Sequence, residues 1–284
     1  MSKTLRLLMP QWQGGNNPAY SFGAQLLAWL APIRENILQV EVPVAPYSNT
    51  KLSTEDGVVG RSVLLQQLND ARHIIDQYQP EKVIVFGGDC LVSQASFSYL
   101  NEKYNGNLGV LWLDAHPDIS TPDMYYHEHA MVLGNLLGGG DPLFSAKVQV
   151  PLKPERIMYG GLCKTTDEET ELIHGLGLRK ATPSELMESS DSILEWITRE
   201  NIQHIAIHLD LDVLDPVQFR SLLFAQPDGT MIDSAHGEMN LSQIARIIQD
   251  VAKQANIVGL SIAEYLPWDA INLYNFLAEL PVWE

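Results

Sequence analysis

Two short segments of this chain carry potential metal ligands at alternate positions. Asp114, His116 and Asp118 form the first set, and Asp210 and Asp212 form the second. In an extended backbone successive side chains point to opposite faces, so residues two apart lie on the same side. Both sets directly follow apolar runs, as expected at the carboxyl end of a buried parallel strand. Because carboxylates gathered at one sheet edge repel one another, we expect cations between them, which indicates a two-metal hydrolytic site rather than two surface turns.

Apolar, strand-like runs alternate along the chain with amphipathic helical patterns. The predicted strands are Thr4–Met9, Ile37–Val44, Lys82–Phe86, Leu108–Leu113, Arg156–Tyr159, Leu176–Arg179, His204–Leu209 and Ile257–Ile262. The predicted helices are Gly60–Tyr78, Leu91–Tyr104, Pro183–Glu200 and Leu241–Gln254. This alternation predicts an α/β fold with a parallel sheet and helices on both faces, in which ligands bind beyond the carboxyl ends of the strands.

Local signals place two helix starts and one long loop. Thr182 and Pro183 suit the first positions of one helix, and Asn240 can cap another. The polar stretch Phe219–Glu238 contains glycine and proline and predicts a loop that can lie over the site.

Length and charge limit the class of protein. The chain has 284 residues and no linker-like tract, which predicts a single domain, 1–284. A formal net charge of −17 argues against nucleic acid and anionic membranes as partners and is compatible with a cationic substrate. Because the apolar runs are too short to span a membrane and the first residues lack the apolar core of a signal peptide, we expect a cytoplasmic location.

A further candidate ligand follows a double glycine. Gly87 and Gly88 end a predicted strand and lead through Asp89 into Cys90. By itself, this pattern fits a tight strand–helix turn with a small buried cysteine as well as it fits a metal ligand. A disulfide between Cys90 and Cys163 is the less expected outcome in a cytosolic enzyme.

Three other residues are candidates for chemistry at the same edge. His127 and His129 follow the first ligand set in a tyrosine-rich loop, and a histidine there can protonate a departing amine. Glu264 follows a predicted strand, where its carboxylate can pair with a cationic substrate group or simply face solvent.

Taken together, these residues resemble the arginase superfamily of ureohydrolases, which includes arginase, agmatinase and formimidoylglutamase. The resemblance extends from about Val83 to Pro267, and five ordered segments carry it: Gly87-Gly88-Asp89-Cys90, where the family has Gly-Gly-Asp-His; Asp114-Ala115-His116-Pro117-Asp118; His129-Ala130-Met131; Asp210-Leu211-Asp212-Val213-Leu214-Asp215-Pro216; and Glu264-Tyr265-Leu266-Pro267.

The resemblance implies a fold and a ligand set. The fold would be a three-layer α/β/α sandwich with a mostly parallel eight-stranded sheet. One metal ion would be bound by Asp114, His116, Asp210 and Asp212. A second ion would be bound by Cys90, Asp114, Asp118 and Asp210.

The resemblance also implies roles in catalysis. A hydroxide between the metals would attack the guanidinium or amidine carbon, and Asp118 would contact that hydroxide. His129 would transfer a proton to the leaving amine, and Glu264 would hold the small cationic substrate. Homo-oligomers are usual in the family, so we expect one here.

Cys90 departs from the family pattern and leaves alternatives open. The family metal is Mn²⁺, two per chain, but a thiolate in place of an imidazole favours Zn²⁺ or Fe²⁺. The first hypothesis is a metal-dependent hydrolase of linear C–N bonds in guanidino or amidine compounds. The alternatives are a single-metal deacetylase-type amidohydrolase and a catalytically degenerate member that binds or regulates.

Overall fold

An eight-stranded parallel sheet forms the centre of the protein. The computed structural model describes residues 3–35, 37–163, 165–278 and 280, and the rest of the predicted domain 1–284 lies outside the described residues. The strand order is β2-β1-β5-β10-β9-β6-β7-β8, and each neighbouring pair is parallel. The strands are β1 (Thr4–Met9), β2 (Leu38–Glu41), β5 (Lys82–Gly87), β6 (Leu108–Leu113), β7 (Ile157–Gly160), β8 (Arg179–Ala181), β9 (His204–Asp210) and β10 (Asn256–Ala263). A separate antiparallel pair consists of β3 (Thr54–Glu55) and β4 (Val58–Val59).

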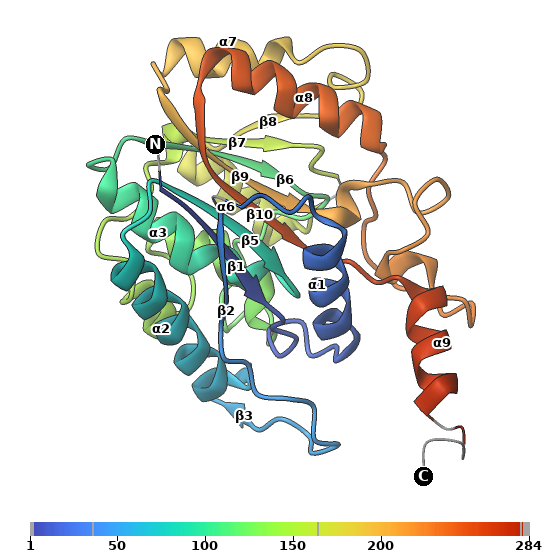
Figure 1. Cartoon of the computed structure of the whole chain (residues 1–284). Helices are drawn as coiled ribbons and strands as arrows, with labels where there is room; N and C mark the ends of the chain where they lie inside the picture. Colours follow the sequence, from blue (N-terminus) through green and yellow to red (C-terminus); the bar gives the residue numbers. More distant parts are fainter. Residues whose placement is uncertain (1–2, 36, 164, 279, 281–284) are drawn as a thin grey trace.

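Helices cover both faces of this sheet (Figure 1). The α-helices are α1 (Ala19–Leu30), α2 (Arg61–Tyr78), α3 (Ser93–Lys103), α4 (Val132–Leu137), α5 (Pro142–Ser145), α6 (Asp167–Leu176), α7 (Asp191–Arg199), α8 (Leu241–Gln254) and α9 (Trp268–Ala278). The short 3₁₀ helices are η1 (Cys90–Val92), η2 (Glu128–Met131), η3 (Pro154–Arg156), η4 (Leu211–Val213) and η5 (Leu223–Ala225). The α/β/α sandwich predicted from the sequence is therefore confirmed.

Strand β6 shows how the two hydrophobic cores are separated. All of its residues are buried, and successive side chains enter opposite sides of the sheet. Val110 and Trp112 pack in the cluster under α2 and α3, whereas Leu111 and Leu113 pack in the cluster under α7 and α8. A strand buried on both faces explains the continuous apolar run in the sequence.

The predicted strands all occur, and β1 and β6 have the predicted bounds. The predicted strand Leu176–Arg179 was wrong at its start. Leu176 still belongs to α6, and Gly177 ends that helix in the left-handed conformation at φ 65°. Strand β8 therefore begins only at Arg179.

The helix predicted to start at Pro183 was also placed too early, because α7 begins at Asp191. Backbone carbonyl groups in the turns between Pro183 and Asp191 accept hydrogen bonds from the Arg246 side chain of α8. In a continuous helix they would accept from amides of the following turn. The Arg246 guanidinium donates to the carbonyl of Met187 at 3.0 Å and to that of Ser189 at 3.4 Å. This tertiary contact overrides the local helical pattern.

A close backbone approach fixes the carboxyl end of β5. A Cβ atom on Gly88 would lie 1.7 Å from the carbonyl oxygen of Gln11, so only glycine fits there. The Gly88 amide donates to the carbonyl of Met9 at 3.1 Å, and its carbonyl accepts from the amide of Glu264 at 2.8 Å. The ends of β1, β5 and β10 are thereby joined beside Cys90.

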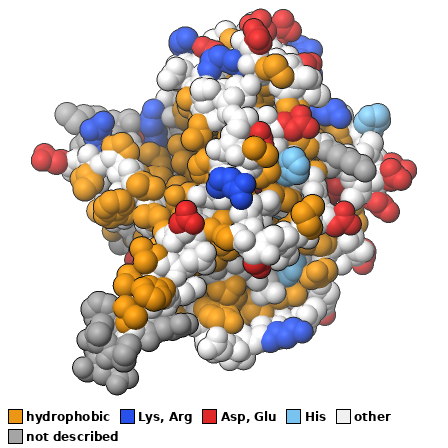
Figure 2. Space-filling model, turned by 90° about the vertical axis from the view of Figure 1, so that its right-hand side faces the viewer, with side chains coloured by type: hydrophobic (Ala, Val, Ile, Leu, Met, Phe, Trp, Pro, Cys, Tyr) orange, Lys and Arg blue, Asp and Glu red, His pale blue; other side chains and the backbone are white. Residues whose placement is uncertain are grey.

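Among the described residues, no helix is both long enough and apolar enough to cross a membrane. Hydrophobic side chains are nevertheless exposed on α9, at the lower left of Figure 2. Leu273, Tyr274 and Phe276 are 56%, 60% and 56% exposed.

The predicted cap of α8 is confirmed and provides a test of local stability. The Asn240 side chain accepts from the Gln243 amide at 3.0 Å, and the Gln243 side chain accepts from the Asn240 amide at 2.9 Å. We expect Asn240→Ala to lower the free energy of unfolding by about 1 kcal/mol, because amides of the first turn lose their acceptor. Urea unfolding measures the change. Gln249→Ala, at an exposed position of the same helix, is the control, and an equal effect of both variants would contradict the capping role.

Candidate metal centre

The predicted site residues gather at the carboxyl edge of the sheet. Strands β5, β10, β9 and β6 are neighbours in its centre and end side by side. The residues that follow them are Cys90 after β5; Glu264 after β10; Asp210 and Asp212 at and after the end of β9; and Asp114, His116 and Asp118 after β6.

One group of potential ligands joins the turns after β6 and β9. His116 Nδ1 lies 3.0 Å from Asp212 Oδ2 and 3.6 Å from Asp114 Oδ1. Both turns close in the same way, because Asp114 accepts from the His116 amide and Asp210 accepts from the Asp212 amide, each at 2.7 Å. Ligand atoms of Asp114, His116 and Asp212 lie within 4.8 Å of one another, which fits one divalent cation.

Cys90 belongs to the neighbouring group. Its Sγ donates to Asp210 Oδ2 at 2.8 Å and lies 3.6 Å from Glu264 Oε1. The cysteine is free and 2% exposed. Burial and the nearby carboxylates, first among them Asp210, raise the pKa of the Cys90 thiol well above its ordinary range. In the absence of a cation this sulfur is therefore a protonated hydrogen-bond donor.

Asp118 and Glu264 have an unusual backbone conformation. Their φ values of 51° and 64° lie in the left-handed region, which costs a non-glycine residue of order 1–3 kcal/mol. Both are buried, whereas the other described non-glycine residues with positive φ are exposed. Backbone strain in buried residues concentrates at functional sites.

Asp118 makes fewer contacts with the other predicted ligands than they make with one another. Its Oδ2 is buried and has no hydrogen-bond partner in the described part of the chain. It is also absent from the groups of ligand atoms within 4.8 Å of one another that the described residues form. Its backbone carbonyl accepts from the amides of Leu133 and Gly134, which hold the turn in place.

Three of the buried carboxylates, Asp118, Asp210 and Asp212, are disfavoured as anions in this structure. Burial, followed by the charges of neighbouring carboxylates, raises the pKa of Asp118 and of Asp210 well above the ordinary range. Burial also raises the pKa of Asp212, to about 6, although His116 opposes it. Such a cluster can be relieved by protons or by cations. The orphaned oxygen of Asp118 and the mixed oxygen, nitrogen and sulfur donors fit divalent metal ions.

Of the two loop histidines, His129 joins the site. Its Nδ1 lies 2.9 Å from Glu264 Oε1, and burial, which alone would lower the pKa of His129, is outweighed by this carboxylate, so the pKa is raised. His127 instead lies against aromatic rings, 4.4 Å from that of Tyr126 between centroids. Burial and the charge of His129 lower the pKa of His127 to about 4.

Sequence reasoning missed two residues of this cluster. Tyr20 of α1 donates to Glu264 Oε2 at 2.6 Å, and no local pattern indicated this contact between distant segments. His208 lies on β9 with its Nε2 3.6 Å from Asp114 Oδ2. The period of two that selected Asp210 and Asp212 also includes His208, so this residue had a sequence signal.

The predicted loop Phe219–Glu238 does lie against the site. Ser234 Oγ is 3.0 Å from His116 Nε2, and the ring of Phe224 stacks near that of His116 with centroids 6.1 Å apart.

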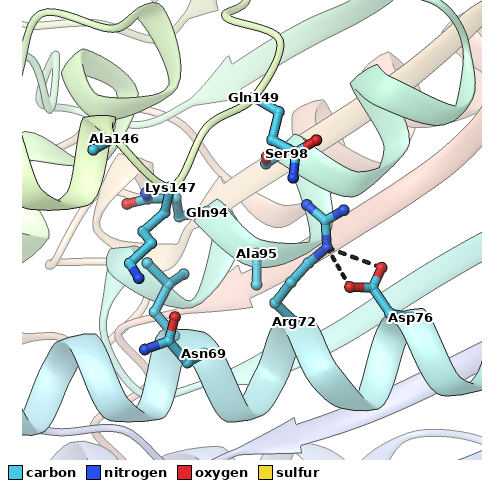
Figure 3. A pocket seen from close by; sticks show the side chains of 10 residues that line it. Asn69, Arg72, Asp76, Gln94, Ala95, Ser98, Ala146, Lys147 and Gln149 are labelled. Carbon is cyan, nitrogen blue, oxygen red and sulfur yellow. Dashed lines mark hydrogen bonds and ion pairs between the residues drawn. The ribbon is translucent and has the colours of Figure 1, made fainter.

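A separate pocket lies between α2 and α3, away from the carboxylates (Figure 3). Arg72 lines it but is already paired, with Asp76 at 3.0 Å and with Glu102 at 2.6 Å. None of the predicted site residues lines this pocket.

Comparison with known proteins assigns the class of this fold. The protein has a three-layer parallel α/β fold with ligand-type side chains at the carboxyl edge of its sheet. The model of the family described as "Arginase family" matches residues 40–273, and the chain therefore belongs to the arginase family.

Similar sequences and structures agree with this assignment. The arginase of Staphylococcus aureus (strain COL) is 30% identical over 142 residues, which cover 48% of this chain and 47% of that protein. The arginase of Eremothecium gossypii is 25% identical over 226 residues, which cover 74% of this chain and 54% of that protein. The chain thus spans about half the length of the curated relatives it matches.

Solved structures share the fold at low sequence identity. The arginase of Bacillus caldovelox has a TM-score of 0.80 and 18% identity, with 94% of this chain and 92% of that chain covered. A putative agmatinase of Clostridium difficile has a TM-score of 0.66 and 19% identity, with 98% and 93% covered.

A buried carboxyl beside the site makes a pH-dependent contribution to stability. Glu128 Oε1 accepts from Asn135 Nδ2 at 2.7 Å, and burial raises the pKa of Glu128 to about 8. In the unfolded chain a glutamate titrates at about 4.3, so between these values the native state binds the extra proton and stability falls as pH rises. Glu128→Gln removes this titration, so the variant does not lose stability in this way as pH rises. The difference in free energy of unfolding, variant minus wild type, should therefore increase from about pH 5 to about pH 8.

Urea unfolding of metal-free protein at both pH values measures this effect. The exposed Glu195→Gln is the matched control and should show an offset that does not change with pH. A constant offset for Glu128→Gln would show that this carboxyl is ionised in the native state throughout.

Proposed function

We propose that the chain hydrolyses the C–N bond of a linear guanidino or amidine compound with the help of two divalent cations, releasing urea or a related amide. The observation that carries this proposal is the buried anion Glu264. Burial alone would raise the pKa of Glu264, but hydrogen bonds from His129 and Tyr20 outweigh it and hold the pKa below its ordinary value. A buried carboxylate kept ionised beside a ligand cluster suits a cationic substrate group, which a neutral amide does not provide.

The remaining roles follow from position. The proposed ligands are Cys90, Asp114, His116, Asp118, Asp210 and Asp212. When bound, two divalent ions would supply a nucleophilic water at neutral pH and neutralise the carboxylates. Asp118, with its free buried oxygen, would orient the attacking water.

His129 is the proposed proton donor to the leaving amine. Its pKa is raised by Glu264, so its imidazole keeps a proton to higher pH than an ordinary histidine. The contact between His129 and Glu264 supports this role, because Glu264 is the residue proposed to hold the guanidinium. Tyr20 holds the other oxygen of Glu264 and so fixes the carboxylate plane.

The relatives support the reaction class. The Entamoeba histolytica arginase structure, with a TM-score of 0.77 and 20% identity, is in complex with L-ornithine, an amine of the kind that such a hydrolysis leaves behind. Another similar structure, with a TM-score of 0.66, is a proclavaminate amidino hydrolase of Streptomyces clavuligerus.

We also propose a cytoplasmic homo-oligomer that uses Mn²⁺, unless Cys90 shifts the preference to Zn²⁺ or Fe²⁺. The two free cysteines suit a reducing compartment. The exposed apolar side chains of α9 suit contact with another copy of the chain.

Asp210→Asn tests the ligand assignment. The substitution replaces a proposed bridging carboxylate with a neutral amide, and we expect at least about a 100-fold loss of urea release together with a lower metal content. Colorimetric urea assays and elemental analysis measure both quantities. The exposed Asp191→Asn, in the first turn of α7, is the control. A fully metallated and active Asp210→Asn would contradict the site.

Cys90→His tests the role of the sulfur. If position 90 binds metal, exchanging thiolate for imidazole should raise the occupancy of Mn²⁺ relative to Zn²⁺ after reconstitution with equal amounts of both. Cys163→Ser, which removes the other thiol, should leave this ratio unchanged. Unchanged metal binding in Cys90→His would mean that position 90 is not a ligand.

A further inference from the structure

His208 is a buried imidazole that the proposed ligand set does not use. It is 0% exposed and lies on the same face of β9 as Asp210, two residues ahead of it. Its Nε2 is buried without a hydrogen-bond partner in the described part of the chain, 3.6 Å from Asp114 Oδ2. A buried ring nitrogen that makes no hydrogen bond and faces a proposed ligand oxygen is in position to bind the same metal ion.

The surroundings of His208 hold the ring in this orientation. Its Nδ1 lies 2.8 Å from Ser93 Oγ and 3.2 Å from Ser261 Oγ, and Ser93 in turn donates to Ser261 at 2.8 Å. The tautomer with a proton on Nδ1 fits this network, because Ser93, which donates to Ser261, can accept from Nδ1–H. In that tautomer the lone pair is on Nε2. The ring of Trp112 stacks on the imidazole with centroids 3.8 Å apart. A metal-binding histidine is oriented in the same way, through its second nitrogen.

We propose that His208 completes a metal site with Cys90, Asp114 and Asp210 that takes a thiophilic divalent cation such as Zn²⁺ or Fe²⁺. The inference rests on the proposed function for the presence of metal, but it changes which side chains hold the ion beside Cys90. The imidazole absent at position 90, where the resembling family has histidine, is then supplied by the neighbouring strand β9. The other ion, beside His116, keeps the group of Asp114, His116 and Asp212.

The distances suit such a site. Ligand atoms of Cys90, Asp114, His208 and Asp210 lie within 4.8 Å of one another, and all four residues are buried. Tetrahedral Zn²⁺ with its usual bond lengths places ligand atoms roughly 3.3–3.8 Å apart, which matches the 3.6 Å between His208 and Asp114. The 2.8 Å from Cys90 Sγ to Asp210 Oδ2 is a hydrogen bond. For both atoms to hold the ion, the thiol would have to lose its proton to solvent.

The test compares His208→Asn with His204→Asn. Asparagine is chosen because its side chain can keep a hydrogen bond to Ser93 or Ser261. His204 is the control because it lies on the same strand but away from the site, where its ring stacks on that of Tyr104 with centroids 4.0 Å apart. Zn²⁺ affinity is measured by chelator competition, and Co²⁺ reports sulfur ligation through its thiolate charge-transfer absorption. We expect His208→Asn to weaken one of two equivalents by at least about 100-fold and to change the Co²⁺ spectrum, with His204→Asn unchanged. Wild-type affinity and spectrum in His208→Asn would overturn the proposal.

A measurement on the unmodified chain covers the case in which His208→Asn does not fold. Side-chain ¹⁵N NMR of wild-type protein should show the Nε2 signal of His208 moving on addition of Zn²⁺, with His204 as the internal reference; a stationary signal would overturn the proposal. Urea release is assayed separately. Zn²⁺ bound through His208 without hydrolysis of any guanidino compound would support this site and contradict the proposed function. Hydrolysis of a guanidino compound, together with unchanged metal binding in His208→Asn, would support the proposed function and contradict the His208 site.

Discussion

The arrangement of this protein depends on the repulsion between carboxylates buried at one edge of its sheet. Four neighbouring strands end at the same place, and the acidic residues at or beyond their ends are Asp114, Asp118, Asp210, Asp212 and Glu264. Histidines stabilise two of these anions, since His116 lies beside Asp114 and His129 beside Glu264. The remaining carboxylates, Asp118, Asp210 and Asp212, are relieved by added protons or by bound cations. The raised pKa values of Asp118 and Asp210 express this conflict. Positive ions are the simplest way for all of these groups to remain in one place at neutral pH.

The fold supplies the rigidity that holds this unfavourable cluster together. Strand β6 is buried on both faces, and the close contact at Gly88 joins the ends of β1, β5 and β10. These elements hold Asp118 and Glu264 in left-handed conformations that flexible loops would relax. Glu264 differs from Asp118, Asp210 and Asp212, because hydrogen bonds from His129 and Tyr20 hold its pKa below the ordinary value.

Much of this arrangement could be predicted from local patterns. The apolar runs located β1 and β6 with their bounds, and the strand ends identified the sheet edge where the ligand-type residues gather. The alternation argument was wrong for His116 and Asp212, because both follow the strand ends in turns closed by the Asp114 and Asp210 side chains. The contact of Tyr20 with Glu264 depends on the packing of α1 across the sheet, which no short pattern encodes.

Two errors have different causes. The start of α7 was misplaced because Arg246 of α8 binds carbonyl groups that a continuous helix would use. His208 was overlooked although it shares the alternation of Asp210, because a histidine inside an apolar strand resembles a core residue. Only the unpartnered Nε2, visible once Ser93 and Ser261 are placed, distinguishes the two cases.

The most direct test of the two-metal account is the metal stoichiometry of the wild-type chain. Metal-free protein is titrated calorimetrically with Mn²⁺ and, separately, with Zn²⁺, and the bound metal is counted by elemental analysis. The account predicts two equivalents per chain with at least one of these ions. A single equivalent with both would contradict it in favour of a mononuclear amidohydrolase, and no bound metal would contradict it in favour of a degenerate, non-catalytic member of the family.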